Sequence, residues 1–146
     1  MKGGERKMMK NIVFAVALSV ILFSSECLAW SPAVIGGIRH GAALGVMFER
    51  GTASSATLRL GFEANTSSTP GIVFIGGKWF LNNIRGGFPM FLSGGLVGYL
   101  GNNHSAAGPY ISLIFERFLD VTPLFLEVGI DVADSGNLQF QMGYYF

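Results

Sequence analysis

The chain has 146 residues, enough for a single domain. Half of its residues are hydrophobic and only 13% are charged, against roughly 25% in an average soluble domain. The formal net charge is +1 and no basic cluster occurs beyond the first ten positions, which argues against a nucleic-acid partner. We therefore expect a large apolar surface, packed either in a core or against lipid.

The first 29 residues have the features of an export signal. A positively charged start precedes an apolar run at 12–23, and Cys27-Leu28-Ala29 offers the small residues of a cleavage site. We predict cleavage after Ala29, so that residues 1–29 are a signal peptide and residues 30–146 are the mature domain.

Two alternatives compete with a cleaved signal. A membrane anchor would need about 20 apolar residues, and this run is shorter. A lipoprotein signal acylated at Cys27 would need a small residue before the cysteine, where this chain has Glu26. Cys27 is the single cysteine, so the domain from residue 30 onward must be held together without a disulfide.

Beyond the signal, apolar and polar residues alternate with the period of two that is typical of β-strands. The alternating stretches are 33–49, 55–65, 71–81, 88–100, 109–119, 124–133 and 137–146. Turn-favouring residues separate them, including Asn82 and Asn83. The first stretch is long for one strand, and Arg39-His40-Gly41 can divide it in two. The pattern then predicts eight strands in an antiparallel meander.

The two faces of these strands favour a membrane barrel over a soluble β-sandwich. The polar faces have little lysine but carry single charges of both signs, which would neutralise one another in a narrow lumen and be costly if unpaired. The apolar faces carry mainly Leu, Ile, Val and Phe, with aromatic residues near strand ends that would form interfacial girdles. The predicted lumen network is Arg59, Glu63, Lys78, Glu116, Glu127 and Asp131, and the predicted girdle is Trp79, Tyr99, Tyr110 and Tyr144.

The last alternating stretch, at 137–146, also favours a closed barrel. In an open sheet this strand would be an exposed edge that promotes aggregation, and closure removes that edge. Nineteen of the 21 glycines follow residue 29, many inside alternating stretches, where glycine permits tight coiling. We therefore expect a small all-β, antiparallel up-and-down transmembrane barrel. A secreted or periplasmic β-sandwich is the alternative fold.

The ending NLQFQMGYYF resembles the C-terminal strand of bacterial outer-membrane β-barrel proteins. Phe140, Met142, Tyr144 and Phe146 match its alternating apolar and aromatic positions, including the final phenylalanine. Together with the export signal and the amphipathic strands, the resemblance covers the whole chain. It implies an eight-stranded barrel in the bacterial outer membrane, surrounded by lipid and monomeric. It also implies that Phe140, Tyr144 and Phe146 are read by the barrel assembly machinery.

The predicted size and loops limit the function. An eight-stranded barrel has an interior just filled by side chains, which argues against a wide pore. The predicted outward loops near 39–41, 66–71, 101–108 and 134–137 are short, which argues against an adhesin. We expect a non-enzymatic barrel that stabilises the membrane or binds a lipid or a small hydrophobic ligand, with no cofactor and no metal site.

One short segment keeps a lipid-modifying hydrolase as the alternative function. Residues 103–108, NHSAAG, partly resemble the His-any-Ser-Asn-Ala-Gly motif of the outer-membrane lipid A deacylases. That resemblance implies Ser105 as nucleophile, His104 as base and Glu116 as acid. In the family the histidine lies two residues before the serine, a place that Asn103 occupies here. Adjacent residues on a strand point to opposite faces, so a polar surface loop is the simpler interpretation.

Overall fold

The computed structural model of the chain describes residues 30–84, 87–101, 104–133 and 135–146. The predicted signal peptide, its cleavage site and Cys27 lie outside the described residues, as does Asn103. Among the described residues, no helix is long and apolar enough to cross a bilayer.

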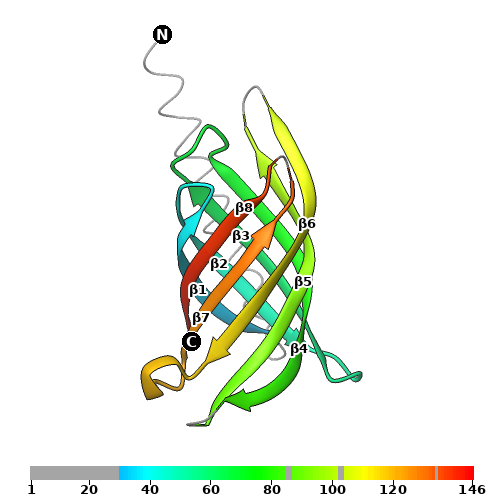
Figure 1. Cartoon of the computed structure of the whole chain (residues 1–146), viewed down its shortest axis with the longest axis vertical. Helices are drawn as coiled ribbons and strands as arrows, with labels where there is room; N and C mark the ends of the chain where they lie inside the picture. Colours follow the sequence, from blue (N-terminus) through cyan, green and yellow to red (C-terminus); the bar gives the residue numbers. More distant parts are fainter. Residues whose placement is uncertain (1–29, 85–86, 102–103, 134) are drawn as a thin grey trace. The chain divides into compact units, whose positions relative to one another are not determined.

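The described chain forms a closed antiparallel barrel of eight strands (Figure 1). Each strand pairs with the next, and the first pairs with the last from Ala33↔Tyr145 to Arg39↔Gln139. Closure confirms the predicted all-β barrel and excludes the β-sandwich alternative. The strands are β1 (Ser31–Arg39), β2 (Ala42–Gly51), β3 (Ala56–Asn65), β4 (Gly71–Ile84), β5 (Phe88–Leu100), β6 (Ser105–Glu116), β7 (Leu124–Asp131) and β8 (Asn137–Tyr145).

The turns confirm the predicted strand count but correct several boundaries. His40-Gly41 divides the first stretch, as predicted. Asn82 and Asn83 do not form a turn, because they pair with Met90 and Pro89 inside the β4–β5 ladder. The predicted loop at 101–108 is shorter, since β6 begins at Ser105. The stretch predicted to reach residue 119 ends at Glu116 and is followed by a one-turn 3-10 helix, η3 (Phe118–Asp120).

The barrel has a long side and a short side. Strands β4, β5 and β6 contain 14, 13 and 12 residues, and we call them the long wall. Strands β7, β8 and β1 contain 8, 9 and 9 residues, and we call them the short wall. The C-terminus and the turn at His40 lie at opposite ends of the barrel (Figure 1), which we call the C-terminal end and the His40 end.

The outer face of the barrel wall is apolar, whereas the inner face carries the buried charges. Large apolar side chains are exposed on the outside of every strand, among them Ile38, Leu44, Phe62, Ile75, Leu96, Ile111, Ile130 and Phe140. The buried polar and charged side chains alternate with them and point inward. Apolar side chains such as Ile35, Met47 and Phe125 also fill part of the interior. The protein therefore differs from a soluble one in its apolar exterior and its many buried charges.

The predicted aromatic girdle is only partly correct. Trp79 and Tyr144 are each 45% exposed on the outer face. Tyr99 and Tyr110 instead lie buried inside the barrel. Both share the inward parity of charged or hydroxylated neighbours on their strands, such as Ser112 two residues after Tyr110, so strand alternation excludes them from the outer face.

Glycine occupies one inward position on each strand. Two of these glycines make room for aromatic rings, because a Cβ at Gly61 would overlap the ring of Phe74 and a Cβ at Gly143 would overlap that of Phe125. Others allow neighbouring strands to coil closely against one another. The eight inward glycines are Gly37, Gly45, Gly61, Gly76, Gly95, Gly108, Gly129 and Gly143.

Candidate functional site

The centre of the barrel interior is organised around Arg59 of β3. Its guanidinium reaches across the barrel to β7 and donates to both carboxylate oxygens of Glu127, at 2.8 and 3.2 Å. Its Nε donates to Glu49 of β2 at 2.9 Å, and its Nη1 donates to the hydroxyl of Ser93 at 2.9 Å. Arg59 is fully buried, and these partners offset the cost of removing its charge from water.

A second cluster surrounds Arg39, at the end of β1. Its Nη1 donates to Glu63 at 2.8 Å and its Nη2 donates to Gln139. The guanidinium also lies over the rings of Phe74 and Tyr110, with centroid distances of 5.2 and 5.5 Å, as in a cation–π contact. Among the described residues, its Nε is a buried side-chain nitrogen without a hydrogen-bond partner, and it lies 3.8 Å from Asp131.

A third cluster lies around Lys78 of β4, towards the C-terminal end. The Lys78 ammonium donates to Glu49, to Glu116 at 2.7 Å and to the hydroxyl of Tyr145 at 3.2 Å. It also lies 4.9 Å from the centroid of the Phe91 ring. The Glu116 side chain keeps 24% of its surface exposed, so water reaches this cluster more easily than the other two.

Shared partners join the three clusters into one network. Gln139 accepts from Arg39 and donates to Glu127 at 2.8 Å, which links the first two clusters. Glu49 accepts from both Arg59 and Lys78, which links the last two. Hydrogen-bonded side chains thus run through the interior along the barrel axis. Such an arrangement fills a narrow barrel rather than leaving a wide passage.

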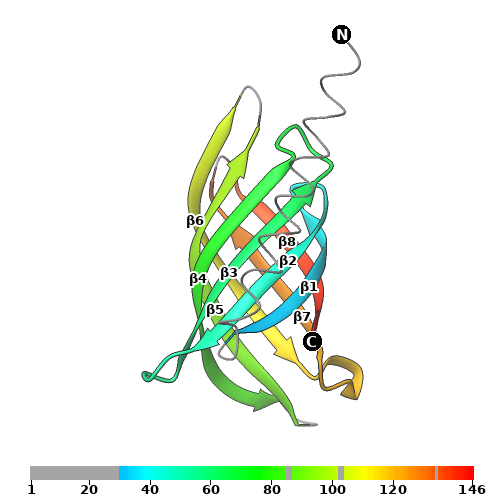
Figure 2. The same ribbon diagram turned by 180° about the vertical axis from the view of Figure 1, so that it is seen from behind.

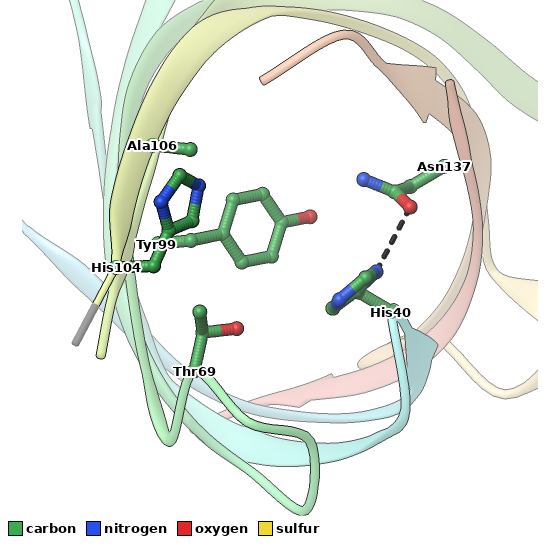
Figure 3. Close-up of a pocket in the computed structure, with 6 residues that line it drawn as sticks. All are labelled: His40, Thr69, Tyr99, His104, Ala106 and Asn137. Atoms are coloured by element: carbon green, nitrogen blue, oxygen red, sulfur yellow. Dashed lines mark hydrogen bonds between the residues drawn. The ribbon is translucent and has the colours of Figure 1, made fainter. Parts of the chain in front are cut away.

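A small pocket lies at the His40 end of the network (Figure 3). Beneath it, Asp131 accepts from Tyr99 at 2.6 Å and from Asn137 at 3.2 Å. The Nδ1 of His40 lies 2.9 Å from the Oδ1 of Asn137. The space holds about one water molecule, too little for a substrate. Its lining residues are His40, Thr69, Tyr99, His104, Ala106 and Asn137.

The structure does not bring the three predicted hydrolase residues together. Ser105 and Glu116 are the first and last residues of β6, roughly 36 Å apart at the usual rise of a strand. Ser105 is exposed on the outer face, whereas Glu116 binds Lys78 at the C-terminal end. His104 lines the pocket at the His40 end. A nucleophile, base and acid must lie within hydrogen-bond reach of one another, and this placement forbids it.

The residues of the predicted assembly signal lie on one outward strip. Phe140 and Tyr144 are exposed on β8, and Phe146 follows that strand. The rings of Tyr144 and Phe146 are 5.6 Å apart, and the backbone N–H of Phe146 donates to Pro32 of β1. This strip is accessible from outside the barrel, as recognition by another protein requires.

Six members of the interior network were predicted from the sequence, and several others were missed. Gln139 and Gln141 lie opposite the aromatic positions of the last strand, so their alternation with Phe140 was the available signal. Glu49 pairs in register with Arg59 across β2 and β3. Arg39 follows the inward parity of Ile35. In the described part of the chain, no group of three or more His, Cys, Asp or Glu residues could hold a metal ion.

Comparison with known proteins finds a structural likeness. No family model matches the sequence, and no curated protein matches it. Among solved structures, the N-terminal β-barrel domain of Pseudomonas aeruginosa OprF superimposes with a TM-score of 0.58 and 9% sequence identity. The match covers 81% of this chain and 97% of that domain. At this identity the likeness concerns the fold, an eight-stranded antiparallel barrel of the outer-membrane type.

Proposed function

We propose that this chain is an integral β-barrel of the bacterial outer membrane with a structural, non-enzymatic role. The observation that carries the proposal is the inverted wall, in which large apolar side chains face outward and the charges face inward. Water would make that outer surface costly, whereas the hydrocarbon of a bilayer solvates it. The likeness to the OprF barrel domain supports the same environment.

The filled interior argues against transport through the barrel and favours a function of its outer surface. The Arg59 and Arg39 clusters fill the barrel from its centre towards the His40 end, and the pocket at that end holds about one water molecule. We propose outer-membrane lipid as the principal partner, bound to a monomeric barrel. The separation of Ser105 from Glu116 gives the deacylase alternative no geometric support.

Export and assembly complete the proposal. Residues 1–29 would direct export and be removed, so the N-terminal residue of the mature protein would be Trp30. The strip of Phe140, Tyr144 and Phe146 would be the surface that the barrel assembly machinery reads. N-terminal sequencing of the mature protein tests the first statement. Accumulation of unassembled Phe146→Ser protein would support the second.

Gel mobility of the protein from isolated outer membranes, boiled and unboiled, tests the proposal directly. A closed barrel resists SDS when cold and migrates differently after heating, so we expect two mobilities in the outer-membrane fraction. The variant Gln141→Pro serves as a control, because proline removes a ladder N–H from β8, which pairs on both sides. It should run at the boiled position without heating. A protein that stays soluble without detergent and shows no shift would refute the proposal.

A further inference from the structure

Strands β4 and β5 continue to pair with each other after their outer neighbours have ended. The β3–β4 ladder ends at Ala56↔Trp79 and the β5–β6 ladder ends at Met90↔Phe115. The β4–β5 ladder runs on to Ile84↔Phe88. We call the described residues 80–84 and 88–89 the overhang. It lies at the C-terminal end of the barrel, at the lower end of β4 and β5 in Figure 2.

Apart from Asn82 and Asn83, the described overhang is apolar, and its large side chains on β4 are exposed. Phe80, Leu81 and Ile84 are 54%, 46% and 39% exposed, and the described overhang contains no charged residue. The β2–β3 turn at the same end is different, because its residues, 52–55, are small or polar. The β6–β7 turn at the same end also exposes Leu119 and Val121, but it carries the charged residues Arg117 and Asp120 beside them. An apolar stretch without charge therefore distinguishes the described overhang from both turns.

The overhang also continues the outer apolar surface of β4. Val73, Ile75 and Trp79 are exposed along that strand before the overhang begins. The outward apolar residues run from Val73 to Ile84, about 36 Å along the strand at the usual rise, or roughly 28 Å along the membrane normal at the usual tilt of about 40°. The apolar band of an outer-membrane barrel is about 25 Å tall. The apolar stripe of β4 therefore extends slightly beyond the hydrocarbon layer, at the overhang.

Water is a poor environment for this segment. Residues 80–84 have no pairing partner on the β3 side, and an unpaired apolar edge in water favours aggregation. A two-stranded hairpin is also marginally stable by itself. The overhang needs partners for its unpaired backbone groups and an apolar environment for its side chains. The headgroup region of a bilayer provides both, because it hydrates backbone groups while apolar side chains enter the acyl boundary.

We infer that the overhang lies in the phospholipid headgroup interface at the C-terminal end of the barrel and anchors the long wall to it. This inference rests on the proposed membrane location, and the continuity of the apolar surface from Ile75 through Trp79 to Ile84 identifies lipid as the occupant. The barrel would thus be held asymmetrically, with a deeper lipid contact on the long wall than on the short wall.

Tryptophan fluorescence in vesicles tests the inference. A background without tryptophan is made by combining Trp30→Phe with Trp79→Phe. It carries one probe at a time: Ile84→Trp in the overhang, Ile75→Trp on the outer face of β4 or Ser54→Trp in the β2–β3 turn. Each protein is folded into phosphatidylcholine vesicles with brominated acyl chains, and a heat-modifiable band verifies folding. We expect the bromines to quench Ile84→Trp and Ile75→Trp. Ser54→Trp should be quenched by aqueous acrylamide instead.

The outcomes separate the inference from the proposed function. If Ile75→Trp is quenched by bromine while Ile84→Trp behaves like Ser54→Trp, the overhang stands in water and the inference is overturned. If Ile84→Trp is shielded from both quenchers, a protein surface covers the overhang, which also overturns it. If Ile75→Trp escapes bromine quenching in a folded protein, the membrane location itself fails.

Discussion

The long wall and the short wall present different chemistry to the same interior. The short wall contributes Arg39, Glu127, Asp131, Gln139 and Gln141, all buried. The long wall contributes mainly apolar and aromatic side chains, among them Ile72, Phe74, Val97, Tyr110 and Ile114. Buried charges therefore predominate on the short wall and apolar side chains on the long wall, although the long wall also holds Lys78 and the short wall also holds Phe125.

Arg39 shows how the two walls fit together. Its guanidinium donates to Glu63 and Gln139 and at the same time lies over Phe74 and Tyr110 of the long wall. Aromatic rings tolerate a cation on their faces while excluding water from it. The difference between the walls teaches that a narrow barrel can bury many charges if they pair locally and an aromatic surface covers them.

The largest effect should come from removing a cation that both walls enclose. Arg39→Met leaves the carboxylates of Glu63 and Asp131 without it, and breaking such a buried pair costs about 3–5 kcal/mol. Lys78→Met should cost less, because its partner Glu116 remains partly exposed to water. Urea unfolding of each variant in vesicles measures the free energy. Equal costs would show that the Lys78 cluster is as dry as the centre.

A second test concerns the outer faces, where the two walls should behave alike. Phe140 on the short wall and Ile111 on the long wall are both exposed near the middle of their strands. Arginine at either position should cost about 2–4 kcal/mol in vesicles, as expected near the bilayer midplane. Ser54→Arg, in a polar turn, is the matched control and should change the unfolding free energy little. A harmless Ile111→Arg would mean that lipid does not cover the long wall.

Alanine substitutions at inward glycines compare the packing of the two walls. A Cβ at Gly143 would overlap side chains only, chiefly the Phe125 ring. A Cβ at Gly76 would overlap the Tyr110 hydroxyl and would also lie 2.6 Å from the backbone oxygen of Gly94. We expect either alanine substitution to cost about 1–3 kcal/mol by overpacking. Phe125→Leu should restore the stability of Gly143→Ala. Tyr110→Phe should restore that of Gly76→Ala only in part, since a backbone atom cannot yield in the same way.

The smallest effect should come from the turn that closes the short wall at the His40 end. His40 has a left-handed φ of 55° and contacts Asn137 of β8 through its ring. Asparagine tolerates this backbone but is too short for the contact, so His40→Asn should cost about 0.5–1.5 kcal/mol, the net value of one hydrogen bond. Thr52→Ala, which removes a turn hydrogen bond at the other end, provides the comparison. A loss as large as that of Arg39→Met would contradict this ranking.

Strand alternation was sufficient to predict most of the fold. The period of two identified the strands, and the long first stretch was correctly divided at His40-Gly41. The overhang was missed because Asn82 and Asn83 have turn-forming chemistry, and only their cross-strand partners hold them in a ladder. Tyr99 and Tyr110 were misplaced because position near a strand end was given more weight than parity.

The pairing inside the barrel was beyond the sequence because it depends on closure. Arg59 and Glu127 are 68 residues apart, and Arg39 and Gln139 are 100 apart. Which inward side chains meet is decided by the stagger of the strands around the barrel, and a single strand pattern carries no information about that stagger. The hydrolase hypothesis failed for the same reason, because the distance between Ser105 and Glu116 also depends on the three-dimensional structure.

The β1–β8 ladder has a kinetic consequence. Its pairs, such as Ala33↔Tyr145, join residues a hundred or more positions apart, so forming this ladder has the highest entropic cost of loop closure in the barrel. Neighbouring hairpins form from local contacts, and folding slows as such distant contacts increase. Until β1 and β8 pair, both are open edges. The lifetime of this open sheet therefore sets the interval in which the chain is exposed to aggregation.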